Sequence, residues 1–240
     1  MKLVICKDYD EASLKASEIV INQIKNKPNS VIGLATGSTP VGLYKKLIEG
    51  FKNGEISFKQ VTTFNLDEYL GISHNHPESY HAFMRDNLFK DVDIQEKNIH
   101  IPSSDLKNAE KNALNYTKAL QKVQVDIQLL GIGTNGHIGF NEPGSSFDNE
   151  TFAIALTEQT RHDNLRFFNT IEEVPTHAVT MGIKTIYRSK KIILMATGLT
   201  KADAIYGMLK GPITPDLPAS ALRNHPDLVV IIDELAASKL

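Results

Sequence analysis

A glycine-rich stretch near the middle of the chain carries three polar side chains that are suited to acid–base chemistry. Residues 131–144 read GIGTNGHIGFNEPG and include Asn135, His137 and Glu142. Histidine changes charge close to neutral pH, and a carboxylate within reach can fix the tautomer of its ring and raise its basicity. The stretch therefore predicts a histidine–carboxylate pair that can move protons.

The same stretch fits the G-x-G-x-x-G pattern of dinucleotide-binding domains, from Gly131 to Gly136. That pattern is meaningful only where a strand precedes it and a helix opens at the third glycine. The apolar run 125–130 supplies the strand, but Gly139, Pro143 and Gly144 break any helix that would follow. We therefore interpret the stretch as a loop and expect no redox cofactor.

Two adjacent carboxylates, Asp67 and Glu68, follow another apolar run in the segment NLDEYLG. Successive side chains of a strand point to opposite faces, so only one of the two should face a crevice at the end of this strand. The spacing leaves open which of them does.

The chain lacks the patterns of common metal and serine enzymes. His137 and Glu142 do not match H-E-x-x-H, there is no G-x-S-x-G elbow, and the single Cys6 excludes a CxxC site. His74 and His76 lie in a polar segment, which favours a solvated loop over a surface metal site. We expect no bound metal.

A hydroxyl-rich turn follows the apolar run 31–35 and consists of Thr36, Gly37, Ser38 and Thr39. Thr39 is suited to cap a helix whose first residue is Pro40. The free N–H groups at a helix N-terminus bind anions, although a well-capped helix without a ligand explains the same pattern.

The pattern recurs in TGLTKADAI, where Lys201 falls in the first turn of a helix. The helix dipole disfavours a cation there, but a bound phosphate would attract both the helix end and the lysine. Arg166, in DNLRFF, has the planar guanidinium that suits phosphate, and Arg161 is an equally basic neighbour. Because no Walker motif is present, a phosphorylated small metabolite is the expected ligand.

Six short runs rich in apolar residues predict strands that are buried on both faces, as in a parallel sheet covered by helices. The runs cover residues 3–6, 31–35, 61–64, 125–130, 192–196 and 228–232. Apolar residues at helical spacing predict helices over 9–24, 41–51 and 109–123. We predict an α/β fold: residues 1–240 form a single three-layer Rossmann-like domain with a mostly parallel sheet flanked by helices. Ligands of such sheets bind at the carboxyl ends of the strands, where the polar motifs should converge.

The bulk composition excludes some partners. A net charge of -2 and a pI of about 6.4 leave no basic surplus for nucleic acid. No apolar stretch is long enough to span a membrane, and the N-terminus lacks a signal-peptide core. We expect a cytoplasmic protein that binds neither nucleic acid nor membrane.

Taken in order, six segments resemble the glucosamine-6-phosphate deaminase (isomerase) family over nearly the whole chain. They are ATGSTP, NLDEYLG, HPESYHAFM, GIGTNGHIGFNEPG, DNLRFF and TGLTKADAI. The fold of this family is shared with 6-phosphogluconolactonases and with sugar-phosphate-sensing domains of transcriptional regulators. The alternatives are a lactonase-like hydrolase and a non-catalytic sensor, and neither would need Asp67. A sensor would also be expected to carry a DNA-binding segment, whereas no helix-turn-helix pattern is seen before Leu3.

The resemblance implies a role for each candidate residue. Asp67 would take the C2 proton of the open-chain sugar and return it to C1, and His137, assisted by Glu142 and Asn135, would open the ring. The turn 36–39, Arg166 and Lys201 would hold the 6-phosphate. Glucosamine 6-phosphate and water would give fructose 6-phosphate and ammonia, a hydrolase reaction of amino-sugar catabolism and N-acetylglucosamine utilisation.

Two departures from the family pattern lead to further expectations. Many relatives carry aspartate where Asn135 stands, so the activity should have a different pH optimum. Phe152 and Ile154 replace the basic residues used by hexameric relatives that N-acetylglucosamine 6-phosphate activates, and the chain ends soon after Ile232. We expect no such activation and favour a monomer over a homo-oligomer.

Overall fold

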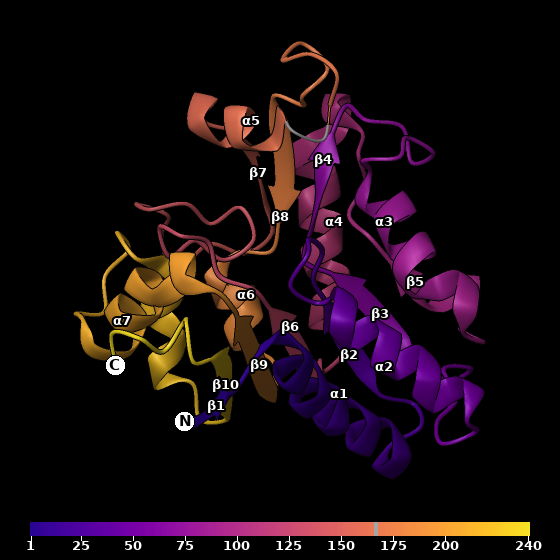
Figure 1. The fold of residues 1–240 in the computed structure, drawn as a ribbon. Coiled ribbons are helices and arrows are strands. Elements are labelled where there is room, and N and C mark those ends of the chain that lie inside the picture. Colours follow the sequence, from indigo (N-terminus) through magenta and orange to yellow (C-terminus); the bar gives the residue numbers. More distant parts are fainter. Residues whose placement is uncertain (166–167) are drawn as a thin grey trace.

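A seven-stranded, fully parallel sheet forms the centre of the molecule (Figure 1). The structure is a computed structural model that describes residues 1–165 and 168–240. The strand order is β1-β10-β9-β6-β2-β3-β5. The bounds are β1 Lys2–Cys6, β2 Val31–Leu34, β3 Thr62–Asn65, β5 Ile99–His100, β6 Ile127–Leu130, β9 Lys191–Ala196 and β10 Leu228–Asp233.

Helices cover both faces of this sheet and complete three layers (Figure 1). The covering helices are α1 Tyr9–Asn26, α2 Val41–Lys52, α3 Tyr80–Asn87, α4 Ala109–Gln121, α6 Ile183–Tyr187 and α7 Ala202–Lys210, whereas α5 Glu158–Asn164 lies away from this sheet (Figure 1). Short 3-10 turns lie at η1 Phe89–Asp91, η2 Glu96–Asn98, η3 Leu106–Asn108, η5 Leu199–Lys201 and η6 Pro218–Asn224.

Each face of the sheet has its own apolar core. The helix α1 buries Ala12, Ala16, Val20 and Ile24, which recur every four residues, and packs with α2 on one face. The opposite face packs against α4, α6 and α7. The predicted α/β architecture with a mostly parallel sheet is confirmed, and all six predicted strands lie in it.

A second, smaller sheet stands beyond the carboxyl edge of the first and was not predicted. Its strands are β4 Asp67–Leu70, β8 His177–Thr180 and β7 Phe152–Ala155, paired antiparallel in that order. Asp67 therefore begins a strand, whereas the sequence placed it at the end of one. Since only Leu66 separates β3 from β4, the chain passes directly from one sheet to the other at this carboxylate.

Residues 131–144 contain no helix, so the third glycine of the G-x-G-x-x-G pattern does not open one. The interpretation as a loop is confirmed. Among the described residues, no helix has the length and apolar character needed to cross a bilayer.

Candidate active site

Asp67 is a nearly buried carboxyl group at the junction of the two sheets. Only 5% of the residue is exposed. Burial raises the pKa of this carboxyl from 3.8 to about 8, and the negative charge of the adjacent Glu68 adds to the shift. A carboxyl group with a pKa near the working pH can both accept and return a proton.

Glu68 points away from Asp67 and caps a helix. Its two carboxylate oxygens accept hydrogen bonds from the backbone N–H groups of Tyr69 (2.8 Å), Tyr80 (3.0 Å) and His81 (3.1 Å), and one of them lies 2.9 Å from Nδ1 of His81. Tyr80 and His81 are the first residues of α3, where an anion stabilises the helix dipole. Of the two carboxylates, the structure therefore leaves Asp67 for the crevice.

The glycine-rich loop passes directly over Asp67. Gly139 has a φ of +58°, and a Cβ atom added there would lie 3.1 Å from Oδ2 of Asp67 and 2.7 Å from Oγ1 of Thr180. Thr180 is the partner of Asp67 in the β4–β8 ladder, and its Oγ1 accepts a hydrogen bond from Phe140 N at 3.2 Å. A residue without a side chain is needed at position 139 for this approach.

Asn135, His137 and Glu142 form one cluster, as predicted. The Nδ2 group of Asn135 donates to Oε2 of Glu142 at 2.9 Å, and Oδ1 of Asn135 accepts from the backbone N–H of His137 at 3.1 Å. The predicted hydrogen bond between His137 and Glu142 is not formed: Nδ1 lies 3.6 Å from Oε2, which is ion-pair distance. Asn135 takes the position between them and holds both.

Glu142 is kept ionised by its neighbours. Burial by itself would raise the pKa of this carboxyl, but His137, Asn135 and Thr160 outweigh it, so the pKa is lowered. Thr160, in α5, donates from Oγ1 to Oε1 at 3.3 Å. The negative charge of Glu142 thus lies 3.6 Å from Nδ1 of His137.

The turn formed by Thr36, Gly37, Ser38 and Thr39 follows β2 and leads into α2. Gly37 adopts a φ of +86°, and the helix begins at Val41, with Pro40 as the cap residue and no capping side chain. The predicted capping role of Thr39 is therefore wrong. Its hydroxyl oxygen instead lies 3.9 Å from the position of a Cβ on Gly131, at the start of the glycine-rich loop.

The second turn repeats this geometry after β9. Gly198 has a φ of +90°, and η5 ends at Lys201, immediately before α7. Lys201 thus stands at the start of a helix, as predicted, and is the N-cap residue of α7. The other predicted phosphate ligand, Arg166, lies outside the described residues.

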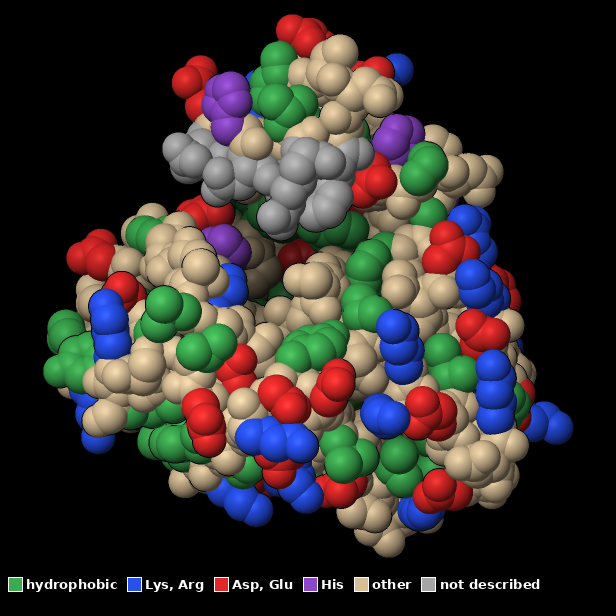
Figure 2. All heavy atoms as spheres, viewed as in Figure 1, with side chains coloured by type: hydrophobic (Ala, Val, Ile, Leu, Met, Phe, Trp, Pro, Cys, Tyr) green, Lys and Arg blue, Asp and Glu red, His purple; other side chains and the backbone are tan. Residues whose placement is uncertain are grey.

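The strand order brings these segments together. β6, which leads into the glycine-rich loop, lies between β9 and β2, which lead into the two turns. Figure 2 shows the molecule hollowed between the small sheet and the large one, with acidic, basic and histidine side chains on the wall of the hollow. The predicted convergence at the carboxyl edge is therefore confirmed for the described segments.

Three contributors to the site were missed by sequence reasoning. Thr160 contacts Glu142, Thr180 lies beside Asp67, and the hydroxyl of Tyr80 interacts with Thr36 and Tyr69. Tyr80 belongs to the family segment HPESYHAFM, which was a usable signal. Thr160 lies in α5 and Thr180 in β8, and nothing in the sequence around either residue identifies it as part of a site.

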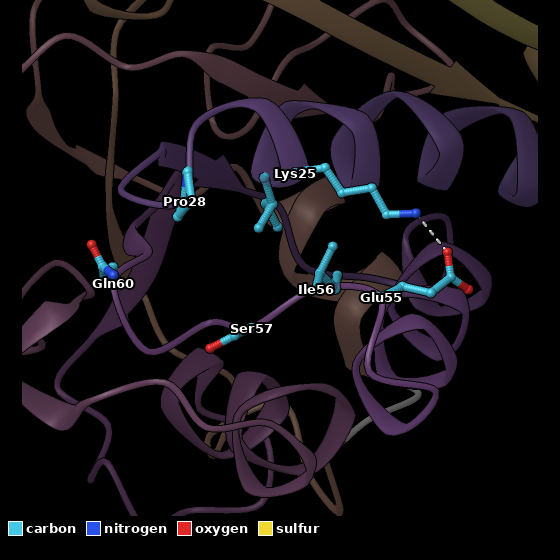
Figure 3. Close-up of a pocket in the computed structure, with 7 residues that line it drawn as sticks. Lys25, Pro28, Glu55, Ile56, Ser57 and Gln60 are labelled. Carbon is cyan, nitrogen blue, oxygen red and sulfur yellow. Dashed lines mark hydrogen bonds and ion pairs between the residues drawn. The ribbon is translucent and has the colours of Figure 1, made fainter.

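A separate pocket of about 260 Å³ lies at the opposite, amino edge of the sheet, between the segments that lead into β2 and β3 (Figure 3). An ion pair of 2.8 Å between Lys25 and Glu55 crosses its rim, and Ile24, Pro28 and Ile56 contribute apolar walls. None of the predicted site residues lines it.

The fold and the clustered motifs define an α/β protein with a polar site at the carboxyl edge of its sheet, and comparison with known proteins identifies its family. Residues 9–230 match the family of glucosamine-6-phosphate isomerases and 6-phosphogluconolactonases. The chain belongs to this family, which confirms the resemblance seen in the sequence.

Relatives similar to this chain over its whole length include proteins named glucosamine-6-phosphate deaminase. A glucosamine-6-phosphate deaminase of Thermoanaerobacter pseudethanolicus is 52% identical over 239 residues, which cover 99% of this chain and 94% of that protein. One from Clostridium botulinum is 49% identical, covering 100% and 97%. The solved structure of a monomeric glucosamine-6-phosphate deaminase has a TM-score of 0.97 and 46% identity over the whole of both chains. A 6-phosphogluconolactonase from Trypanosoma cruzi, with a TM-score of 0.79 and 24% identity over 100% of this chain and 96% of that one, shares the fold.

Proposed function

We propose that this protein is a glucosamine-6-phosphate deaminase, which converts glucosamine 6-phosphate and water into fructose 6-phosphate and ammonia. Full-length relatives at about half identity carry this name. The observation that carries the proposal is Asp67, whose pKa is raised to about 8 and which lies against the loop that holds His137. A lactonase or a binding protein has no use for a carboxyl group tuned in this way.

The phosphate of the substrate would bind at the two glycine turns. The backbone N–H groups of residues 36–39, the ammonium of Lys201 and the guanidinium of Arg166 offer donors and positive charge from separate parts of the chain. Binding energy gained at this remote group would hold the scarce open-chain sugar in a reactive geometry.

His137 would open the pyranose ring by moving a proton from the O1 hydroxyl to the ring oxygen O5. This requires an imidazole that is protonated and deprotonated in turn. Glu142 places its carboxylate 3.6 Å from Nδ1 of this ring, and Asn135 holds Glu142 and the backbone of His137 by its two hydrogen bonds. The geometry thus favours a positioning role for Asn135.

Asp67 would then remove the C2 proton and return it to C1, so that the aldose becomes a ketose imine. Water adds to the imine carbon C2, the C–N bond breaks and ammonia leaves. The carboxyl must be ionised to start this sequence, so activity should rise with pH towards the pKa of about 8 of Asp67.

The chemical class follows from the sum of these steps. The family and the relatives are named as isomerases and deaminases. These names do not support the class of hydrolase that we expected from the sequence. The proposed reaction resembles a hydrolysis only in that water enters and ammonia leaves in the net reaction.

We further propose that residues 1–240 act as one domain and as a monomer, since the 46% identical solved deaminase is monomeric. A cytoplasmic role in N-acetylglucosamine utilisation is consistent with the proposed reaction.

Ammonia release from glucosamine 6-phosphate by the purified protein tests the proposal. Wild type should release ammonia, whereas Asp67→Asn should not. Exchange of the C2 proton with deuterium from solvent separates the carbon step from ring opening, because His137→Gln should slow exchange from the cyclic substrate and Asp67→Asn should abolish it.

Two controls complete this test. Asp126→Asn alters a buried carboxyl group at the other edge of the sheet and should keep the activity. 6-Phosphogluconolactone serves as the second substrate, and its hydrolysis without ammonia release from the amino sugar would reject the deaminase.

A further inference from the structure

The two turns at the proposed phosphate site share a five-residue pattern. Residues 35–39 read ATGST and residues 196–200 read ATGLT. The turns follow β2 and β9, which flank β6, and their glycines, Gly37 and Gly198, have φ values of +86° and +90°. A Cβ at either glycine would meet no atom within 4 Å. The left-handed backbone, and not a lack of space, therefore calls for glycine in both turns.

Each turn is held by a side chain from a neighbouring element. The hydroxyl of Tyr9, at the start of α1, donates to Ser38 O at 3.0 Å and accepts from Gly42 N at 2.7 Å. At the second turn the holding group is Asp233, the last residue of β10. Its two carboxylate oxygens accept from Gly198 N at 3.0 and 2.9 Å.

Asp233 also ties the second turn to the C-terminal segment. One of its oxygens accepts from Ala236 N at 2.8 Å, and only 5% of the residue is exposed. A carboxylate can accept all of these bonds at once, because its two oxygens provide several acceptor sites. An asparagine whose Oδ1 keeps the bonds to Gly198 N and Ala236 N would turn its NH₂ group towards Gly198 N, where Oδ2 of Asp233 accepts, and would set two donors against each other at the turn.

We propose that Asp233 is a positioning residue for substrate binding: by holding Gly198 it sets the turn 198–201 and places the ammonium of Lys201 against the substrate phosphate. This inference rests on the proposed function. Asp233 lies behind the turn and acts through Lys201, so it serves binding of the phosphate and not the proton transfers at C1 and C2.

Steady-state kinetics of Asp233→Asn tests the proposal. The KM for glucosamine 6-phosphate should rise about tenfold while kcat changes less than about twofold, since a displaced Lys201 costs binding energy and leaves Asp67 in place. The matched control is Asp126→Asn, which removes the charge of another buried carboxylate at the opposite edge of the sheet and should leave KM unchanged. An equal rise in KM for both variants would mean general loosening of the fold and overturn the proposal.

A double-mutant cycle with Lys201→Met tests the route of the effect. If Asp233 acts through Lys201, Asp233→Asn should add little to the KM of Lys201→Met. Fully additive effects would overturn the proposal. Gly198→Ala disturbs the turn without touching the carboxylate and should raise KM in the same way, which keeps the test valid if Asp233→Asn folds poorly.

Inorganic phosphate, measured by calorimetry, separates this proposal from the enzyme assignment. Asp233→Asn should weaken its binding several-fold relative to wild type and Asp126→Asn. If wild type binds phosphate and Asp233→Asn binds it less well while no ammonia is formed, the positioning role stands and the deaminase assignment fails. Unchanged phosphate binding in Asp233→Asn would overturn the positioning role.

Discussion

The two edges of the central sheet each bury a carboxyl group, and they treat it in opposite ways. At the amino edge, Asp126 pairs with Lys27 at 2.6 Å and Lys190 at 3.3 Å and accepts from Val31 N at 2.9 Å. Burial would raise its pKa, but the lysines and the amide outweigh burial and lower it. At the carboxyl edge, Asp67 has another carboxylate, Glu68, beside it, and its pKa is raised to about 8.

The difference shows how one protein separates stability from chemistry. A buried carboxylate with cationic partners stabilises the fold in its charged form and has no reason to bind a proton near neutral pH. A buried carboxyl next to a like charge costs stability when ionised and therefore accepts a proton readily. The first kind ties segments together, and the second kind is suited to act as a base.

The largest expected effect lies at Asp67. Asp67→Asn should lower kcat by about 10³-fold or more, because a positioned base contributes about 10²–10⁴-fold. It should also stabilise the protein: the folded pKa is raised from 3.8 to about 8, so wild type loses stability as pH rises through this window and the variant does not. Thermal unfolding at pH 4 and pH 8 measures this, with a higher melting temperature of the variant expected at pH 8 only. Equal melting temperatures at both pH values would show that ionised Asp67 is not strained by burial.

Two left-handed glycines give the next comparison. Gly139 and Gly54 have φ values of +58° and +72°, and substitution by alanine costs each about 1 kcal/mol of backbone strain. Gly139→Ala should in addition lower kcat about 10²-fold, because its Cβ would press on Asp67 and Thr180, whereas the Cβ at Gly54 meets no atom within 4 Å. Parallel measurements of kcat and unfolding free energy check this. A similar kcat for both variants would mean that the contact over Asp67 is not needed.

At the amino edge the expected effect is on stability alone. Asp126→Asn should cost about 1–3 kcal/mol at pH 7, because hydrogen bonds to a charged group are lost, and should keep kcat. The pKa of Asp126 is lowered, so its contribution is present above the unfolded value of 3.8 and disappears as pH falls through the folded value. Denaturation at pH 7 and pH 3 tests the sign, since the gap between wild type and variant should close in acid. A gap that persists at pH 3 would assign the loss to packing.

The smallest effect is expected at Asn135. Asn135→Asp adds a negative charge beside His137 and favours its protonated form, so the pH optimum should move upward by about half a unit to one unit. Asn135→Ser removes the amide without adding charge and is the matched control. A pH profile of kcat/KM that is the same for wild type and Asn135→Asp would rule out electrostatic support of His137 from this position.

Most strands and three helices of the fold could be predicted from apolar patterns within short segments of the sequence. Runs rich in apolar residues located six strands of the parallel sheet, and helical spacing located α1, α2 and α4, because both patterns can be read from a segment's own residues. The sequence did not predict the small sheet, because β7 is only partly buried and β4 follows β3 after a single residue, so that the two strands read as one segment. Antiparallel pairing of β4 with β8 joins residues more than a hundred positions apart, and no local pattern encodes it.

The candidate site divides in the same way. Motif spacing and residue type are local properties, so the amino-acid sequence already showed which side chains are suited to the chemistry. They include Asn135, His137, Glu142 and the two glycine turns. The packed molecule was needed to choose between Asp67 and Glu68, to add Thr160 and Thr180, and to find the hydrogen bonds from Gly198 N to Asp233. Those choices depend on which strands lie side by side and on which carboxylate finds backbone donors, and such neighbours are set by the packing of the whole chain.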